Sequence, residues 1–129
     1  MIAVDTNVIV RYLVADEPEQ FRRATALMEN DAILISSTVV LEAEWVLRSI
    51  YRLNRSAVLG ALRKLTTLPT VSIDDPARLS RAFDWAERGM EFADALHLAA
   101  ASACEAFTSF DRALKSTAAE LGATPVRTP

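Results

Sequence analysis

Short apolar segments alternate with helical segments along the whole chain, and this alternation limits the possible folds more than any other feature. The apolar segments are only a few residues long and apolar almost throughout, as expected for strands buried on both sides. The predicted strands are 2–4, 32–36, 70–73 and 106–110, with "TPVRT" (124–128) as a candidate edge strand. The predicted helices are 7–15, 17–30, 37–53, 55–66, 75–89, 91–106 and 111–122.

Strands that alternate with helices favour a parallel sheet covered by helices on both faces. We therefore predict an α/β fold, a three-layer α/β/α sandwich with a short central parallel sheet. The sequence of 129 residues contains no repeat, linker or low-complexity segment. Residues 1–129 are accordingly predicted to form a single domain.

The sequence gives no sign of a membrane or an exported protein. No apolar run approaches the roughly 20 residues that a membrane span needs. Asp5, Arg11 and Asp16 interrupt the apolar start of the chain, which argues against a signal peptide. The single Cys104 cannot form an internal disulfide, and in its alanine-rich segment we expect it to be a small buried residue. A cytoplasmic protein is expected.

The formal net charge of −3 disfavours a protein that binds nucleic acid by bulk charge alone. The distribution of charge is uneven, however, because the segment 45–73 contains no Asp or Glu. Its cations are Arg48, Arg52, Arg55, Arg63 and Lys64. They are candidates for RNA binding, and the alternative is a solvated helix surface that is cationic without a partner.

Two acids directly follow predicted strands. Asp5 comes after the first strand and Asp111 after the fourth. In open α/β sheets, ligands bind outside the carboxyl ends of the strands, so both residues are candidate ligands. Each also has a structural alternative, because Asp before a helix is a favoured N-cap.

The helix predicted at 37–53 carries two glutamates with different expected environments. At 100° per residue, its apolar arc consists of Val39, Ala43, Val46, Leu47 and Ile50. Glu42 falls at the edge of this arc and is predicted to point at or beside the packed interior, where a carboxylate needs a cation or several donors. A rim position with a solvated head group is the alternative. Glu44 falls on the opposite side with Arg48 and is predicted to be an ordinary surface charge.

Asp94 lies in the first turn of the apolar helix predicted at 91–106. A helix this apolar is surrounded by protein, so its N-terminal acid is expected to open into a crevice. The alternative is a favourable interaction with the helix dipole alone.

Four acids gathered in one place would repel one another, and a hard divalent cation such as Mg²⁺ or Mn²⁺ would resolve this repulsion. Such a site suits hydrolysis of a phosphodiester without a covalent enzyme intermediate. Asn7 and Ser109 are candidate supporting residues, with local bonding to the backbone as the alternative for both. No phosphate-binding Gly-rich loop is present, and His97 is the only histidine, which excludes a zinc site with several histidine ligands.

With these acids identified, the sequence resembles the PIN-domain nucleases and, within them, the VapC-type toxins of bacterial toxin–antitoxin pairs. The resemblance spans essentially the whole chain and rests on four motifs: "VDTNV" at 4–8, "LEAEWVL" at 41–47, "FADALHLA" at 92–99 and "TSFDRAL" at 108–114. It implies that Asp5, Glu42, Asp94 and Asp111 bind Mg²⁺ or Mn²⁺. Ser109 matches the small hydroxyl residue that commonly precedes the last acid by two positions.

The resemblance further implies an endoribonuclease that cleaves RNA, is held inactive by a cognate antitoxin and is usually a dimer. Trp45 is a candidate anchor for a subunit or antitoxin contact, with a plain core or rim residue as the alternative. Tyr51 is assigned to packing.

Two other functions stay open at this point. One is a non-catalytic RNA- or protein-binding module that uses the cations of 45–73. The other is a phosphate-handling α/β protein of another class. A phosphatase of the haloacid-dehalogenase type, however, normally has a second Asp where this chain has Asn7.

Overall fold

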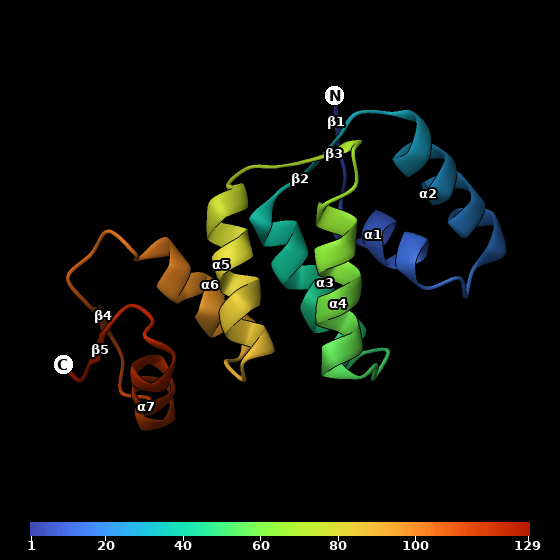
Figure 1. Cartoon of the computed structure of the whole chain (residues 1–129). Helices are drawn as coiled ribbons and strands as arrows, with labels where there is room; N and C mark the ends of the chain where they lie inside the picture. The colour runs from blue at the N-terminus through green and yellow to red at the C-terminus, as the bar shows by residue number, and fades with distance from the viewer. The chain divides into compact units, whose positions relative to one another are not determined.

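The computed structural model describes residues 1–129 and contains seven helices and five short strands (Figure 1). The chain divides into two compact units, Met1–Pro76 and Ala77–Pro129. The predicted α/β class with a short parallel sheet is confirmed. None of the helices combines the length and apolar character that crossing a membrane requires.

The first unit contains a three-stranded parallel sheet in the order β1-β2-β3. Its strands are β1 (Ile2–Ala3), β2 (Ile33–Ile35) and β3 (Val71–Ile73). The central strand is the buried one, since Ile33 and Ile35 are both 0% exposed. The prediction of a buried first strand was wrong: β1 is exposed, and only Val4 after it is buried. The reason is that β1 is an edge strand with a single neighbour.

Four helices complete this unit: α1 (Thr6–Leu13), α2 (Pro18–Asn30), α3 (Ser37–Ser49) and α4 (Arg55–Thr66). The helix α1 packs against α2 and α3, and α3 also packs against α4 (Figure 1). The starts follow ordinary capping chemistry. Pro18 occupies the first turn of α2, and the side chains of Ser36 and Asn54 accept N–H bonds at the starts of α3 and α4.

The buried face of α3 differs from the predicted one. The predicted arc included Val39, Val46 and Ile50, but Val39 and Val46 are half-buried and Ile50 is 62% exposed. The residues that are buried are Ser37, Val40, Ala43, Glu44 and Leu47. The buried face is therefore rotated so that it contains a carboxylate, which an apolar arc alone does not predict.

The second unit contains α5 (Pro76–Glu87) from its second residue on, α6 (Phe92–Ala100) and α7 (Arg112–Leu121), together with β4 (Phe107–Thr108) and β5 (Val126–Arg127). The two strands pair in parallel as a separate two-stranded sheet, so the candidate edge strand at the end of the chain is confirmed with β4 as its partner. Rings from α5 and α6 meet in the core, where the centroids of Phe83 and Phe92 are 5.2 Å apart.

The helix α6 is buried as predicted but ends at Ala100, earlier than the predicted residue 106. A series of turns follows it, in which Cys104 N–H donates to the carbonyl oxygen of Ala101 (2.9 Å). The prediction of a buried Cys104 was wrong, since this residue is exposed. The small side chains after Ala100 offer little apolar area to bury, so nothing holds these turns in the core.

Candidate functional site

Asp5 and Glu42 are linked through Thr6 in the first unit. Asp5 follows β1 and is the N-cap of α1, and its Oδ1 accepts the backbone N–H of Thr6 (2.8 Å). The hydroxyl of Thr6 donates to Oε1 of Glu42 on α3. Thr6 is only 7% exposed, so this hydrogen bond fixes the Glu42 carboxylate from the buried side.

Both acids line one cavity of about 340 Å³, which we call the acidic cavity. Its lining residues are Asp5, Thr6, Asn7, Val10, Arg11, Glu42, Val46, Ile50 and Tyr51. Asp5 and Glu42 are exposed, so their remaining oxygens are accessible. The prediction that Glu42 points at or beside the core was therefore wrong in one respect: its carboxylate faces an open cavity and its helix buries Glu44 instead.

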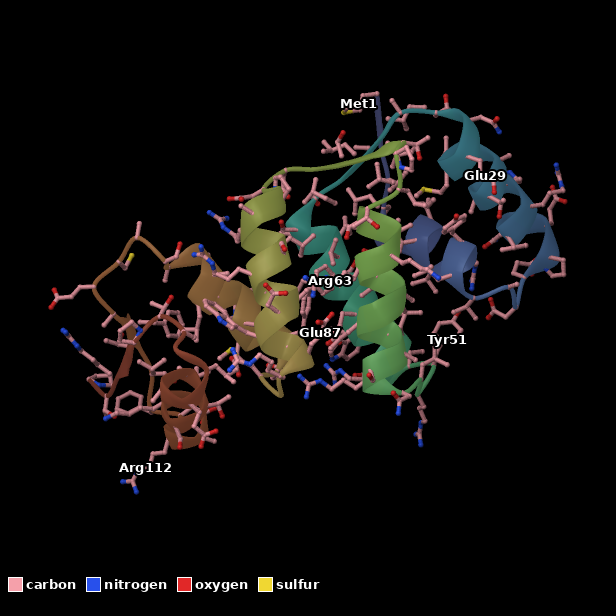
Figure 2. The ribbon with its side chains drawn as sticks, viewed as in Figure 1. Met1, Glu29, Tyr51, Arg63, Glu87 and Arg112 are labelled. Carbon is pink, nitrogen blue, oxygen red and sulfur yellow. The ribbon has the colours of Figure 1, made fainter.

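A polar network borders the acidic cavity. Nη1 of Arg11 donates to the hydroxyl of Tyr51 (2.9 Å) and to Oδ1 of Asp16 (3.3 Å), and Nε of Arg11 donates to Oε1 of Gln20 (2.6 Å). The Tyr51 hydroxyl in turn donates to Oδ2 of Asp16 (3.2 Å). Tyr51, labelled in Figure 2, follows the end of α3. The assignment of Tyr51 to packing alone was therefore wrong, because its hydroxyl accepts a hydrogen bond from Arg11 and donates one to Asp16.

The sequence held a weak signal for these additional residues. Arg11 is four positions after Asn7 on α1, so the two share a helix face with Asp5 at its start. Thr6 stands inside the motif that identified Asp5. Tyr51 gave no local signal, because its role depends on a partner that is distant in sequence.

Asp94 and Asp111 belong to the second unit. Asp94 lies in the first turn of α6. Partial burial raises the pKa of Asp94, and the negative charges of Glu91 and Asp111 raise it further, while His97 opposes the shift. Asp111 is the N-cap of α7, and its Oδ1 accepts the backbone N–H of Leu114 (3.0 Å). The two acids are thus close enough for their charges to interact.

Several candidate site residues also make the local capping or backbone bonds that the sequence offered as alternatives. Asp5 and Asp111 both cap helices, each through one carboxylate oxygen, which leaves the other oxygen for a ligand. Ser109 Oγ accepts the backbone N–H of Asp111 (3.0 Å), which is the local bond considered for it. Asn7 lines the acidic cavity. Neither unit contains three or more His, Cys, Asp or Glu side chains grouped to hold a metal ion.

The cations of 45–73 do not form a uniform basic face. Nε of Arg48 donates to both oxygens of Glu44 (3.1 and 3.0 Å), so its charge is neutralised within α3. The prediction that Glu44 is a surface charge was wrong, since it is 3% exposed. Arg63, labelled in Figure 2, and Lys64 line a shallow cavity along α4. Arg52 is exposed, and Arg55 is half-buried at the start of α4.

Comparison with known proteins identifies the family. No curated protein matches the sequence. The family model described as PIN domain matches residues 2–120, a range that runs from β1 into α7 and includes all four candidate acids. Because this match covers nearly the whole chain, the protein belongs to the PIN domain family.

Proposed function

We propose that this protein is an endoribonuclease that depends on Mg²⁺ or Mn²⁺, with Asp5, Glu42, Asp94 and Asp111 as its metal-binding and catalytic residues. PIN domains are typically nucleases, generally with divalent metal ions, and the family match supports a hydrolase of this general kind. The observation that carries the proposal is the pair Asp5 and Glu42, which come from segments far apart in sequence, share Thr6 as a neighbour and line one cavity.

The donor chemistry of both acid pairs fits a hard cation. Asp5 and Glu42 present accessible carboxylate oxygens, which are the ligands that Mg²⁺ and Mn²⁺ prefer. In the second unit, the raised pKa of Asp94 reflects burial and neighbouring negative charge, two effects that a bound cation would counter. When bound, such an ion supplies Lewis acidity toward a phosphate and activates water for attack.

The chain's own residues hold and orient the reacting groups. Thr6 fixes one oxygen of Glu42, which leaves the other directed to the cavity. Asn7 offers an amide donor at the cavity wall. The proposed reaction is attack of water on phosphorus, cleavage of one P–O bond of the RNA backbone and transfer of a proton to the departing oxygen, without a covalent enzyme intermediate.

We extend the proposal to a toxin of the VapC type in the cytoplasm, controlled by a cognate antitoxin and assembled as a homodimer. The four motifs of the resemblance support this assignment. The first unit also exposes large apolar side chains in the second half of α3 and after it: Trp45 is 52% exposed, Ile50 62% and Leu53 43%. Exposed apolar groups of this size are typical of protein–protein contacts.

The substitution Asp5→Asn tests the proposal with little risk to the fold, because Asn is as good an N-cap as Asp. Changes in residues that only support metal ligands cost about 10–100-fold in activity, so loss of a ligand should cost about 100-fold or more. We expect wild-type protein to cleave RNA with Mg²⁺ or Mn²⁺ and to lose cleavage in EDTA. After induced expression, sequencing of RNA ends should show cleavage for wild type but not for Asp5→Asn. Growth of the same cultures should stop with wild type and continue with Asp5→Asn.

The matched control is Glu29→Gln, which removes an exposed carboxylate from α2 (Figure 2) and should leave cleavage unchanged. Full cleavage by purified Asp5→Asn would contradict the role of Asp5. Metal-independent RNA binding by the wild type, with no cleavage of varied RNAs, would instead support the non-catalytic binding module.

A further inference from the structure

A second cavity of about 500 Å³ lies between α1 and α2 in the first unit. We call it the α1–α2 cavity. Its lining residues are Asn7, Val8, Arg11, Gln20, Arg23, Ala24 and Leu27. Its volume falls within the range of small-molecule sites, roughly 300–1,000 Å³. It is therefore large enough for one nucleotide unit.

The side chains that line the α1–α2 cavity carry positive charge and no negative charge. The lining contains two guanidinium groups and two side-chain amides, and no acid. Arg11 is already held by Asp16, Gln20 and Tyr51. Arg23 supplies the second positive charge. Guanidinium and amide donors on an apolar floor suit a phosphate, because a guanidinium bonds two phosphate oxygens at once.

Arg23 lines the α1–α2 cavity, whereas its neighbour Arg22 does not. Nη2 of Arg22 donates to Oε1 of Glu19 (2.7 Å). This hydrogen bond and the charge of Arg22 lower the pKa of Glu19, and the charge of Arg23 lowers it further to a smaller extent. Arg22 therefore already has an acid as partner and does not line the cavity. The two arginines are adjacent on one helix, but only Arg23 faces the cavity.

The α1–α2 cavity adjoins the acidic cavity, because Asn7 and Arg11 line both. One side of this shared wall presents the carboxylates of Asp5 and Glu42, and the other presents Arg23. An RNA that places one phosphate at the acidic side, on the cation proposed there, therefore has a cationic cavity for a phosphate next to it.

We propose that the α1–α2 cavity is an RNA subsite that binds a backbone phosphate beside the one that is cleaved, with Arg23 as its principal contact. This proposal rests on the proposed nuclease function, since it takes RNA as the ligand. Arg23 is a binding residue here and does not touch the reacting atoms. It should act on KM for RNA more than on kcat.

The test compares Arg23→Gln with Arg22→Gln, which removes the same charge from the same helix. Binding of a fluorescein-labelled RNA oligonucleotide is measured by anisotropy in an Asp5→Asn background, and KM and kcat are measured in the otherwise unchanged protein. We expect Arg23→Gln to raise Kd and KM about 10-fold, the loss of one charge-assisted contact. The dependence of log Kd on log salt should fall by about 0.7, as for one lost phosphate contact on a single strand. Arg22→Gln should change both constants less than twofold.

Equal effects of the two substitutions on RNA, or weaker binding of a free mononucleotide with unchanged binding of RNA, would overturn the subsite. If RNA is cleaved while Arg23→Gln behaves as wild type, the subsite fails and the nuclease function stands. If no RNA is cleaved but Arg23→Gln still selectively weakens RNA binding, the nuclease function fails and the cavity stands as an RNA-binding site.

Discussion

Glu42 and Glu44 are two positions apart on α3, but their carboxylates lie in opposite environments, one exposed and one buried. Glu42 faces the acidic cavity, where the Thr6 hydroxyl holds one of its oxygens and the other stays accessible. Glu44 is buried and is neutralised by Arg48 one turn later. A buried carboxylate is tolerated only when it is paired, so Arg48 is required by the fold rather than free for RNA.

Arg48→Met should therefore lower stability, because it keeps the aliphatic stem but leaves the Glu44 carboxylate buried without its cation. Since Arg48 is itself about one third exposed, we expect a loss of about 1–3 kcal/mol in the free energy of unfolding, measured by urea denaturation.

The control is Arg22→Met, which removes the exposed pair with Glu19 and should have a much smaller effect because solvent screens that pair. Equal losses in the two variants would show that the pair in α3 is no more important than a surface ion pair.

At the scale of elements, a carboxylate ties the end of β3 to the start of α3. Oδ1 of Asp74 accepts both the backbone N–H of Ser37 (2.9 Å) and its hydroxyl (2.7 Å). Partial burial opposes ionisation of Asp74, but these hydrogen bonds, with one from the Asp75 N–H, lower its pKa overall. The negative charge also lies at the positive end of the α3 dipole. This link holds in place the helix that carries Glu42.

The lowered pKa of Asp74 predicts a pH-dependent contribution to stability. A carboxylate with a lowered pKa in the folded state stabilises the fold above its unfolded pKa, near 3.9, and loses this contribution as the pH falls toward the folded value. The difference in unfolding free energy between wild type and Asp74→Asn should therefore be largest at neutral pH and should shrink below about pH 4.

Urea denaturation at several pH values between neutral and about 3 measures this difference. Ser37→Ala removes the hydroxyl donor and should reduce the same pH-dependent part. A wild-type advantage over Asp74→Asn that stays constant through the acidic range would show that the charge of Asp74 has no such role.

At the scale of the whole molecule, the family match and the division into units differ in their bounds. The PIN domain model spans 2–120, whereas the boundary between the two units in the sequence falls after Pro76. The smaller unit, Ala77–Pro129, is below the roughly 60 residues at which an isolated domain is already marginal. We therefore propose that residues 1–129 fold as one domain.

The two tryptophans provide a test of this proposal, because Trp45 belongs to the first unit and Trp85 to the second. Trp45→Phe leaves fluorescence only from the second unit, and Trp85→Phe leaves it only from the first. If the chain is one cooperative domain, each variant should show the same unfolding midpoint by fluorescence as by circular dichroism. A fluorescence midpoint that departs from the circular dichroism midpoint of the same variant would show that the units unfold independently.

Much of the fold followed from local chemistry. The order of strands and helices, the start of α2 at Pro18, the cap of α7 at Asp111 and the ends of α5 and α7 near Gly89 and Gly122 were all predictable, because caps, prolines and glycines act within a few residues. The acids Asp5 and Asp111 were identified in the same way, from their positions after strands.

The sequence by itself determined which segments are helices and strands and which acids are candidates for a metal. Only the tertiary structure decided which side of α3 is buried, that Glu44 pairs with Arg48, and that Tyr51 joins Arg11 at the acidic cavity. The physical reason is that periodicity measures apolar character along one element. The burial of a charge depends on a partner, and a partner distant in sequence is brought close only by folding.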